Sequence, residues 1–198
     1  MTAASRTTSA HVLRYNVAGL LKAAPGEIRT YPVTGELIEI ADDLSLAAPI
    51  EGELRLSKTS RSVLVHADLS TQLVLRCSRC LVEMTAPVDV TVDEEALPSV
   101  DFETGKPLDI DDEPEALRID EHHELDLHET IREAISLAEP IAPLCREDCR
   151  GLCVTCGTDL NADPAHHHED DAIDPRLAAL AAWRDDADAT PGPPDRTH

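Results

Sequence analysis

The amino-acid sequence predicts an α+β fold: an antiparallel β-sheet, open or barrel-like, with a helix at about residues 126–139, a Cys-rich zinc-binding segment and a short C-terminal helix. Two patterns carry this prediction. Apolar and polar residues alternate over much of the first half of the chain, which is typical of strands with one wet face. Later, apolar residues recur at helical spacing, and four of the six cysteines follow them.

Local patterns predict the strands in chain order. An extended piece begins at Val12, a turn of helix follows at Leu20 and Leu21, and Pro25 with Gly26 breaks it. Alternation then predicts five strands with one face toward the core. These strands are residues 27–33, 50–57, 63–67, 72–76 and 88–93. Only four residues of the chain are aromatic, so the core must be aliphatic.

Two helices are predicted after the strands. Asp126 and Glu129 have the spacing of a capping box, and apolar residues at helical spacing follow until Pro140. The second helix begins at Asp174-Pro175 and carries a short apolar stripe. The residues of that stripe are Leu177, Leu180, Ala181 and Trp183.

Charge divides the chain into segments. Residues 1–80 carry nine Lys or Arg and eight Asp or Glu side chains, so residues 81–198 carry a net charge of −23. Acidic and proline-rich composition predicts a solvated loop over residues 93–121 and a disordered tail over residues 185–198. The predicted organisation is a β-rich domain over 11–92, the acidic loop, a segment over 122–184 with the helix, the Cys/His residues and the short helix, and the tail.

The total charge of −22 argues against a protein that coats phosphate backbones or anionic membranes by bulk attraction. The longest apolar run, residues 177–183, is far shorter than the roughly 20 residues of a membrane span. The first 14 residues lack a basic start and an apolar stretch, which predicts a cytoplasmic location. In that reducing compartment, six cysteines indicate metal ligands or redox thiols rather than disulfides.

The cysteines lie in two places. Cys77 and Cys80 form one Cys-x-x-Cys pair after a predicted strand, and the other four lie within residues 145–156. A Cys-x-x-Cys turn aims two thiolates at one ion, and Gly157 supplies the positive φ that such a turn often needs. Zinc is the expected ion for sulfur and imidazole donors, with one or two ions per chain.

The spacing leaves the grouping of the donors open. In the arrangement with two ions, Cys153, Cys156, His166 and His168 hold one ion, while Cys77, Cys80, Cys145 and Cys149 hold the other. In the arrangement with one ion, the donors are either the four local cysteines, Cys145, Cys149, Cys153 and Cys156, or the two Cys-x-x-Cys pairs. The histidines could equally be a solvated polar tract.

One compact basic patch stands out. Residues 58–62 are predicted as a hairpin tip, with Arg55, Lys58 and Arg61 around it. These three side chains are candidate RNA contacts.

The Cys and His residues also suggest two kinds of enzyme. A thiol oxidoreductase would need a helix N-terminus to activate a thiol, and Cys77 follows a strand instead. A zinc deaminase is suggested by His122, His123 and Glu124 before the spaced cysteines. No proline precedes Cys145, Cys149 or Cys153, and aromatic residues that could stack a base are scarce.

Motifs in order along residues 12–184 resemble the YceD family, also called DUF177. They are residues 17–26, Cys77 to Leu81, residues 125–134 with Arg-Glu-Ala, Pro143-Leu-Cys, Gly151-Leu-Cys-x-x-Cys-Gly, Asp159-Leu-Asn and Asp174-Pro-Arg-Leu. The resemblance implies a non-enzymatic bacterial or plastid factor needed for accumulation of 23S ribosomal RNA, with no catalytic residues to carry over. Some members lack part of the cysteine set, and others have Cys-x-Cys where this chain has its His tract.

Together these observations predict a non-catalytic ribosome-biogenesis factor with structural zinc. Its partner would be rRNA or a basic large-subunit ribosomal protein, the latter held by the acidic surface of residues 93–139. The alternative is a thiol redox protein or a zinc-dependent enzyme that uses the Cys-x-x-Cys motifs.

Overall fold

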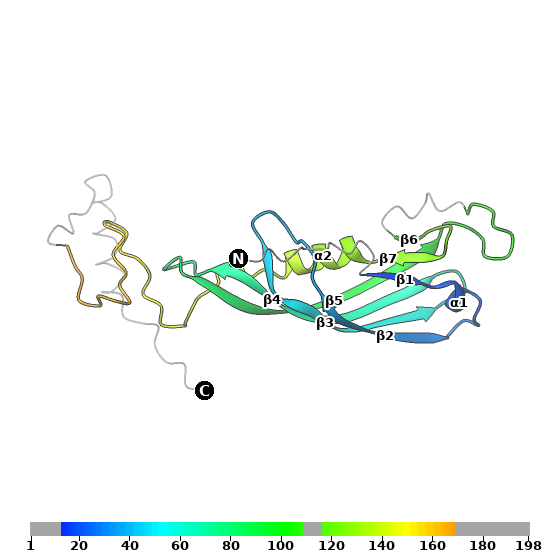
Figure 1. Ribbon diagram of the computed structural model, residues 1–198, viewed down its shortest axis with the longest axis horizontal. Helices are drawn as coiled ribbons and strands as arrows, with labels where there is room; N and C mark the ends of the chain where they lie inside the picture. The colour runs from blue at the N-terminus through cyan, green and yellow to red at the C-terminus, as the bar shows by residue number, and fades with distance from the viewer. Residues whose placement is uncertain (1–12, 109–115, 169–198) are drawn as a thin grey trace, which may run out of the picture. The chain divides into compact units, whose positions relative to one another are not determined.

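The computed structural model describes residues 13–108 and 116–168 (Figure 1). The chain divides into two compact units, Met1–Gly151 and Leu152–His198. This division falls inside the segment 122–184 that the sequence groups together. The helix predicted from Asp174 and the tail over 185–198 lie outside the described residues.

The first unit is built on one seven-stranded sheet, in the order β1-β7-β6-β5-β4-β3-β2. Neighbouring strands are antiparallel, as predicted, except for the parallel pair β5 and β6. The strands are β1 (Arg14–Asn16), β2 (Ile28–Glu36), β3 (Ser45–Lys58), β4 (Val63–Arg76), β5 (Glu83–Pro98), β6 (Leu117–Ile119) and β7 (Glu124–Asp126). The α+β prediction is therefore confirmed, with most of the architecture in the sheet.

The sheet curls into a half-barrel whose two edge strands approach each other. The rings of Tyr15 in β1 and Tyr31 in β2 lie 5.3 Å apart, although these strands stand at opposite ends of the strand order. Side chains alternate along β4 between buried and exposed, so one face forms an aliphatic core and the other meets water. The predicted wet face and aliphatic core are both present.

Strand β4 joins two segments that the sequence predicts as separate strands, 63–67 and 72–76. The polar residues between them hide the alternation. Leu69 is buried on the inner face, and Thr71 also faces inward because its hydroxyl donates a hydrogen bond to the Ala48 carbonyl at 2.8 Å. Because its hydroxyl is hydrogen-bonded, Thr71 can lie on the core face, and β4 continues through it as one strand of 14 residues.

Strands also enter the segment 93–121, for which the sequence predicts an acidic loop. β5 continues to Pro98, and β6 occupies Leu117–Ile119. Ala96, Leu97 and Ile119 are buried, so a few apolar residues among many acidic ones suffice to fix these strands in the core.

Two helices are present in the described residues. α1 (Ala18–Leu21) is the predicted short turn, and α2 (His128–Leu137) lies within the predicted 126–139. Figure 1 shows α2 across one face of the sheet, where Ile131 and Ile135 are buried. Neither helix in this part of the chain has the length and apolar character to cross a membrane.

The start of α2 differs in detail from the predicted capping box. A carboxylate oxygen of Asp126 accepts a hydrogen bond from the His128 N–H at 2.9 Å. Glu129 instead pairs with Arg132, whose guanidinium also donates to the Ile40 carbonyl at 2.9 Å. Arg132 therefore pairs with Glu129, which in a capping box would accept a hydrogen bond from the backbone. Arg132 also links α2 to the connection between β2 and β3.

The close approach of β3 and β4 gives a test of the sheet. A Cβ at Gly52 would lie 2.1 Å from the Asp68 carbonyl oxygen, so Gly52→Ala must force the two backbones apart. We expect a loss of at least about 2 kcal/mol in the free energy of unfolding, measured by urea denaturation. Gly35→Ala is the control, because its φ of +77° adds strain of only about 1–2 kcal/mol while its surroundings are open. A smaller loss for Gly52→Ala than for Gly35→Ala would contradict this account.

Candidate metal centres

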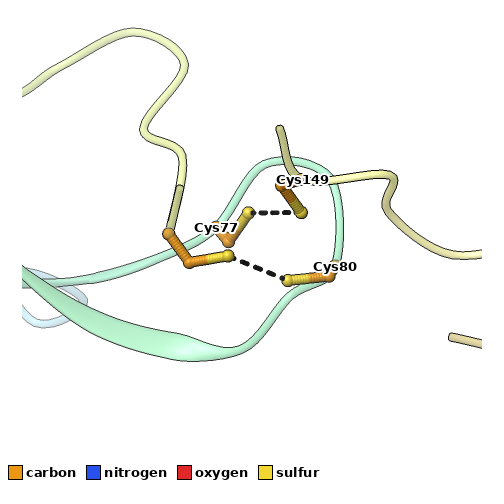
Figure 2. Close-up of side chains that lie close together, drawn as sticks. Cys77, Cys80 and Cys149 are labelled. Atoms are coloured by element: carbon orange, nitrogen blue, oxygen red, sulfur yellow. Dashed lines mark hydrogen bonds between the residues drawn. The ribbon is translucent and has the colours of Figure 1, made fainter. Parts of the chain in front are cut away.

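The first candidate centre joins the tip of the β4–β5 hairpin to the segment that follows α2. Cys77 and Cys80 lie in the hairpin connection, and Cys145 and Cys149 in the later segment. Figure 2 shows the side chains of Cys77, Cys80 and Cys149 pointing toward one another. The four sulfur atoms all lie within 4.8 Å of one another, so this group could hold a metal ion.

The sulfur distances suit a tetrahedral ion. The Cys77 and Cys149 sulfurs are 3.8 Å apart, and the Cys80 and Cys145 sulfurs are 3.6 Å apart. Four thiolates bound to zinc at about 2.3 Å have sulfurs about 3.8 Å from one another. A disulfide would need a separation of about 2.05 Å. None of the six cysteines forms a disulfide in the structure.

Backbone hydrogen bonds shape the turn that carries the first two thiols. The Cys77 N–H donates to the Val82 carbonyl, and the Leu81 N–H donates to the Cys77 carbonyl, both at 2.9 Å. Leu81 closes the turn with a φ of 61°, a conformation that favours glycine. The sequence gives no indication of this left-handed position, because leucine rarely adopts a positive φ.

Three further contacts hold the later segment on this turn. The N–H and the hydroxyl of Ser78 both donate to the Pro143 carbonyl, at 2.8 and 3.0 Å. The Arg79 guanidinium donates to the Cys149 carbonyl at 2.7 Å. Gly151 also passes so close to Arg79 that a Cβ would lie 2.9 Å from the Arg79 carbonyl oxygen. These contacts bring thiols about 70 residues apart in sequence into one group.

The four thiols differ in acidity. Main-chain N–H groups of Cys80 and Cys145 lower the pKa of Cys77 to about 6. Loss of contact with water, together with the neighbouring thiols, raises the pKa of Cys145 to about 12. One thiolate is therefore favoured by the protein itself, while four thiolates together require a bound cation.

Leu81 offers a test of the turn that leaves the donors intact. Leu81→Gly should relieve roughly 1–2 kcal/mol of strain at φ 61°, and about half of that gain is offset by the greater freedom of glycine in the unfolded chain. The exposed leucine side chain contributes little packing. We expect unchanged metal content and a net gain of roughly 0.5–1 kcal/mol by chemical denaturation. A lower metal content or a clear loss of stability would show that the turn needs the leucine.

The second candidate centre lies within the second unit. The Cys153 sulfur is 3.3 Å from His168 Nε2, and the Cys156 sulfur is 3.1 Å from His166 Nε2. The two Nε2 atoms are 3.2 Å apart. These four donors form the second group that could hold a metal ion. The donor separations are slightly shorter than the roughly 3.4–3.6 Å expected around tetrahedral zinc with two sulfur and two nitrogen ligands.

The turn of the second centre repeats the hydrogen bonds of the first. The Cys153 N–H donates to the Thr158 carbonyl, and the Gly157 N–H to the Cys153 carbonyl, both at 2.8 Å. Gly157 has the positive φ, 76°, that the sequence predicts. Main-chain N–H groups of Cys156 and Thr155, and then the His168 side chain, lower the pKa of Cys153 to about 6.

The structure places the eight predicted donors in two groups of four, with the members that the two-ion arrangement gives them. His122 and His123, which mimic a deaminase motif, lie between β6 and β7 and belong to neither donor group. His123 instead lies 5.0 Å from the Phe102 ring.

The predicted RNA contacts lie at the other end of β4 from the first centre. Arg55 and Lys58 are in β3, and Arg61 is in the β3–β4 connection. Arg55 and His66 line an open hollow of about 530 Å³ together with acidic residues of β5. Those residues are Asp93, Glu94 and Glu95. A hydrogen bond from His66 Nδ1 to a carboxylate oxygen of Asp93 raises the pKa of His66 above its usual value. The basic patch therefore borders an acidic surface that the local sequence did not reveal.

A comparison with protein families identifies a family that this chain resembles. The model of the family described as "Large ribosomal RNA subunit accumulation protein YceD" matches residues 65–183, a span that includes all eight candidate donors. The motif at residues 17–26 lies outside the matched span.

Similar proteins occur in mycobacteria. ML1660 of Mycobacterium leprae is 36% identical over 67% of this chain and 58% of its own length. Mb2951c of Mycobacterium bovis and Rv2926c of Mycobacterium tuberculosis are each 37% identical over 67% of this chain and 61% of their own length. All three are described as uncharacterized, and the chain spans about three fifths of their lengths. No solved structure is significantly similar to the chain.

Proposed function

The chain belongs to the YceD family, and on that premise we propose that it is a non-catalytic factor that promotes accumulation of 23S rRNA and assembly of the large ribosomal subunit. The family match is the observation that carries this proposal. Deleting the gene should lower 23S relative to 16S rRNA.

The metal centres support a structural role for zinc within this function. Each centre offers four sulfur or nitrogen donors, the number that fills the coordination shell of a structural zinc ion. Catalytic zinc usually keeps one position open for water or substrate. Two closed sites therefore favour a scaffold whose shape depends on zinc over a zinc-dependent enzyme.

One observation favours the alternative of a thiol redox protein. Cys77 shares a lowered pKa with reactive thiols, although its side chain is buried and reactive thiols are at least partly exposed. Titration of free thiols before and after chelation separates the two functions. Thiols that react only after chelation support structural zinc. Thiols that react at once and cycle between dithiol and disulfide support redox chemistry.

The direct partner is either rRNA or a basic ribosomal protein. Arg55, Lys58 and Arg61 would favour RNA, while the acidic surface beside them would favour a basic protein. A pulldown from cell lysate with and without nuclease distinguishes these partners. RNA-mediated capture of ribosomal components is lost with nuclease, whereas direct capture of one basic protein persists.

Salt dependence tests direct RNA contact. If the basic patch binds rRNA, replacing Arg55, Lys58 and Arg61 with glutamine should weaken binding and flatten the salt slope by up to about one unit per lost phosphate contact. Binding is measured by filter retention between low and moderate salt. The control is Arg76→Gln with Arg146→Gln and Arg150→Gln, which removes the same three positive charges near the first centre, at the other end of β4. An unchanged slope in the triple variant would favour a protein partner.

A further inference from the structure

The described part of the second unit, residues 152–168, lacks the regular secondary structure and the buried core that usually stabilise a fold. It contains no helix and no strand longer than an isolated bridge, and each of its residues is at least partly exposed. Among the residues that the structure describes, the buried aliphatic core lies entirely in the first unit. Segments this short rarely fold without a disulfide or a metal ion, because they bury too little apolar surface.

Local hydrogen bonds give these residues shape but little stability. Leu152 and Asp159 form a bridge, and an Asp159 carboxylate oxygen accepts a hydrogen bond from the Asn161 N–H at 2.9 Å. Such contacts of exposed groups contribute little, because water competes for each donor and acceptor. The feature that joins the start of this segment to its end is the convergence of Cys153 and Cys156 with His166 and His168.

We propose that residues 152–168 fold only around a Zn²⁺ ion held by Cys153, Cys156, His166 and His168, and that this ion exchanges more readily than the ion of the first centre. Zinc supply would then control the order of residues 152–168 while the sheet of the first unit stays folded. This inference concerns metal binding alone and does not depend on a role in rRNA accumulation.

Burial and donor chemistry make the two centres unequal. In the first centre, Cys77 and Cys149 are buried, and the sheet holds the first of them whether or not metal is bound. Cys156 of the second centre is exposed. Cys145 of the first centre is exposed as well, but the second centre has no buried donor at all, so a chelator can reach all of its ligands. The four thiolates of the first centre carry more negative charge than the two thiolates and two neutral imidazoles of the second centre. The first centre therefore attracts Zn²⁺ more strongly.

Staged metal removal from the full chain tests the proposal. The protein, loaded with two equivalents of Zn²⁺, is treated with increasing chelator and followed by zinc release and by hydrogen exchange of peptides. We expect the first equivalent to leave with at least about a tenfold loss of protection in residues 152–168 and unchanged protection in β4 and β5. Release of both ions in a single step, or protection of residues 152–168 after all zinc has left, would overturn the proposal.

Matched histidine variants assign the exchangeable ion. His166→Ala should leave one equivalent of zinc and abolish protection in residues 152–168. His167→Ala should retain both equivalents, because the His167 ring contacts the Ala165 carbonyl and is no member of the donor group. Cobalt substitution gives a second readout: the remaining ion in the His166 variant should show the spectrum of four sulfur ligands. Two retained equivalents in His166→Ala would also overturn the assignment.

Discussion

Replacing Cys77 with serine is expected to release the metal ion of the first centre and to lower the free energy of unfolding of the first unit by roughly 3–5 kcal/mol. The expected loss in stability is a fraction of the binding free energy of structural zinc, which is about 10–16 kcal/mol in small zinc domains. Cys77 is fully buried and links β4 to the segment after α2, so its loss also frees that segment. The remaining three sulfurs cannot complete a tetrahedral site.

The measurement combines metal content with chemical denaturation under reducing conditions. Cys153→Ser is the matched control, because it removes a thiolate from the second unit, whose described residues contribute no strand to the sheet. We expect that control to lose one ion without shifting the unfolding of the sheet. A Cys77→Ser variant that keeps two ions, or wild-type protein that is free of metal with six reactive thiols, would contradict the account.

The sequence predicts the sheet and the donors better than it predicts their connections. Alternation finds parts of β2 to β5, but Thr71 interrupts the apolar pattern of β4, and only its hydrogen bond to Ala48 explains its place in the core. The end of β5 is hidden because Glu94 and Glu95 dominate the local composition. An acidic composition therefore does not reliably predict a loop where two or three buried residues hold a strand in the sheet.

The donor types are visible from spacing, whereas their grouping is not. Cys145 and Cys149 are much nearer in sequence to Cys153 than to Cys77, yet the structure groups them with Cys77. The reason is tertiary: Ser78 binds Pro143, and Arg79 binds Cys149, so the segment after α2 returns to the hairpin tip. No local pattern reports such contacts.

Deletion of the gene is expected to produce the largest effect in cells: immature large-subunit particles and reduced mature 23S rRNA. The reason is the proposed function, since loss of an assembly factor leaves precursor RNA open to degradation. Sucrose gradients should show a smaller 50S peak with slower-sedimenting particles beside it. A chain that ends at Asp185 should restore the normal profile, because residues 186–198 offer almost nothing apolar to bury. Failure of this shortened chain would give the tail a role that its composition does not suggest.

The ratio of mature 23S to 16S rRNA in a clean deletion, with and without the wild-type gene restored, tests the central claim most directly. The account predicts a reduced ratio in the deletion and recovery on complementation. Cys77→Ser should recover the ratio less than wild type if the first centre supports the function. An unchanged ratio with normal subunit profiles would contradict the proposed function and would favour redox chemistry at Cys77 and Cys80.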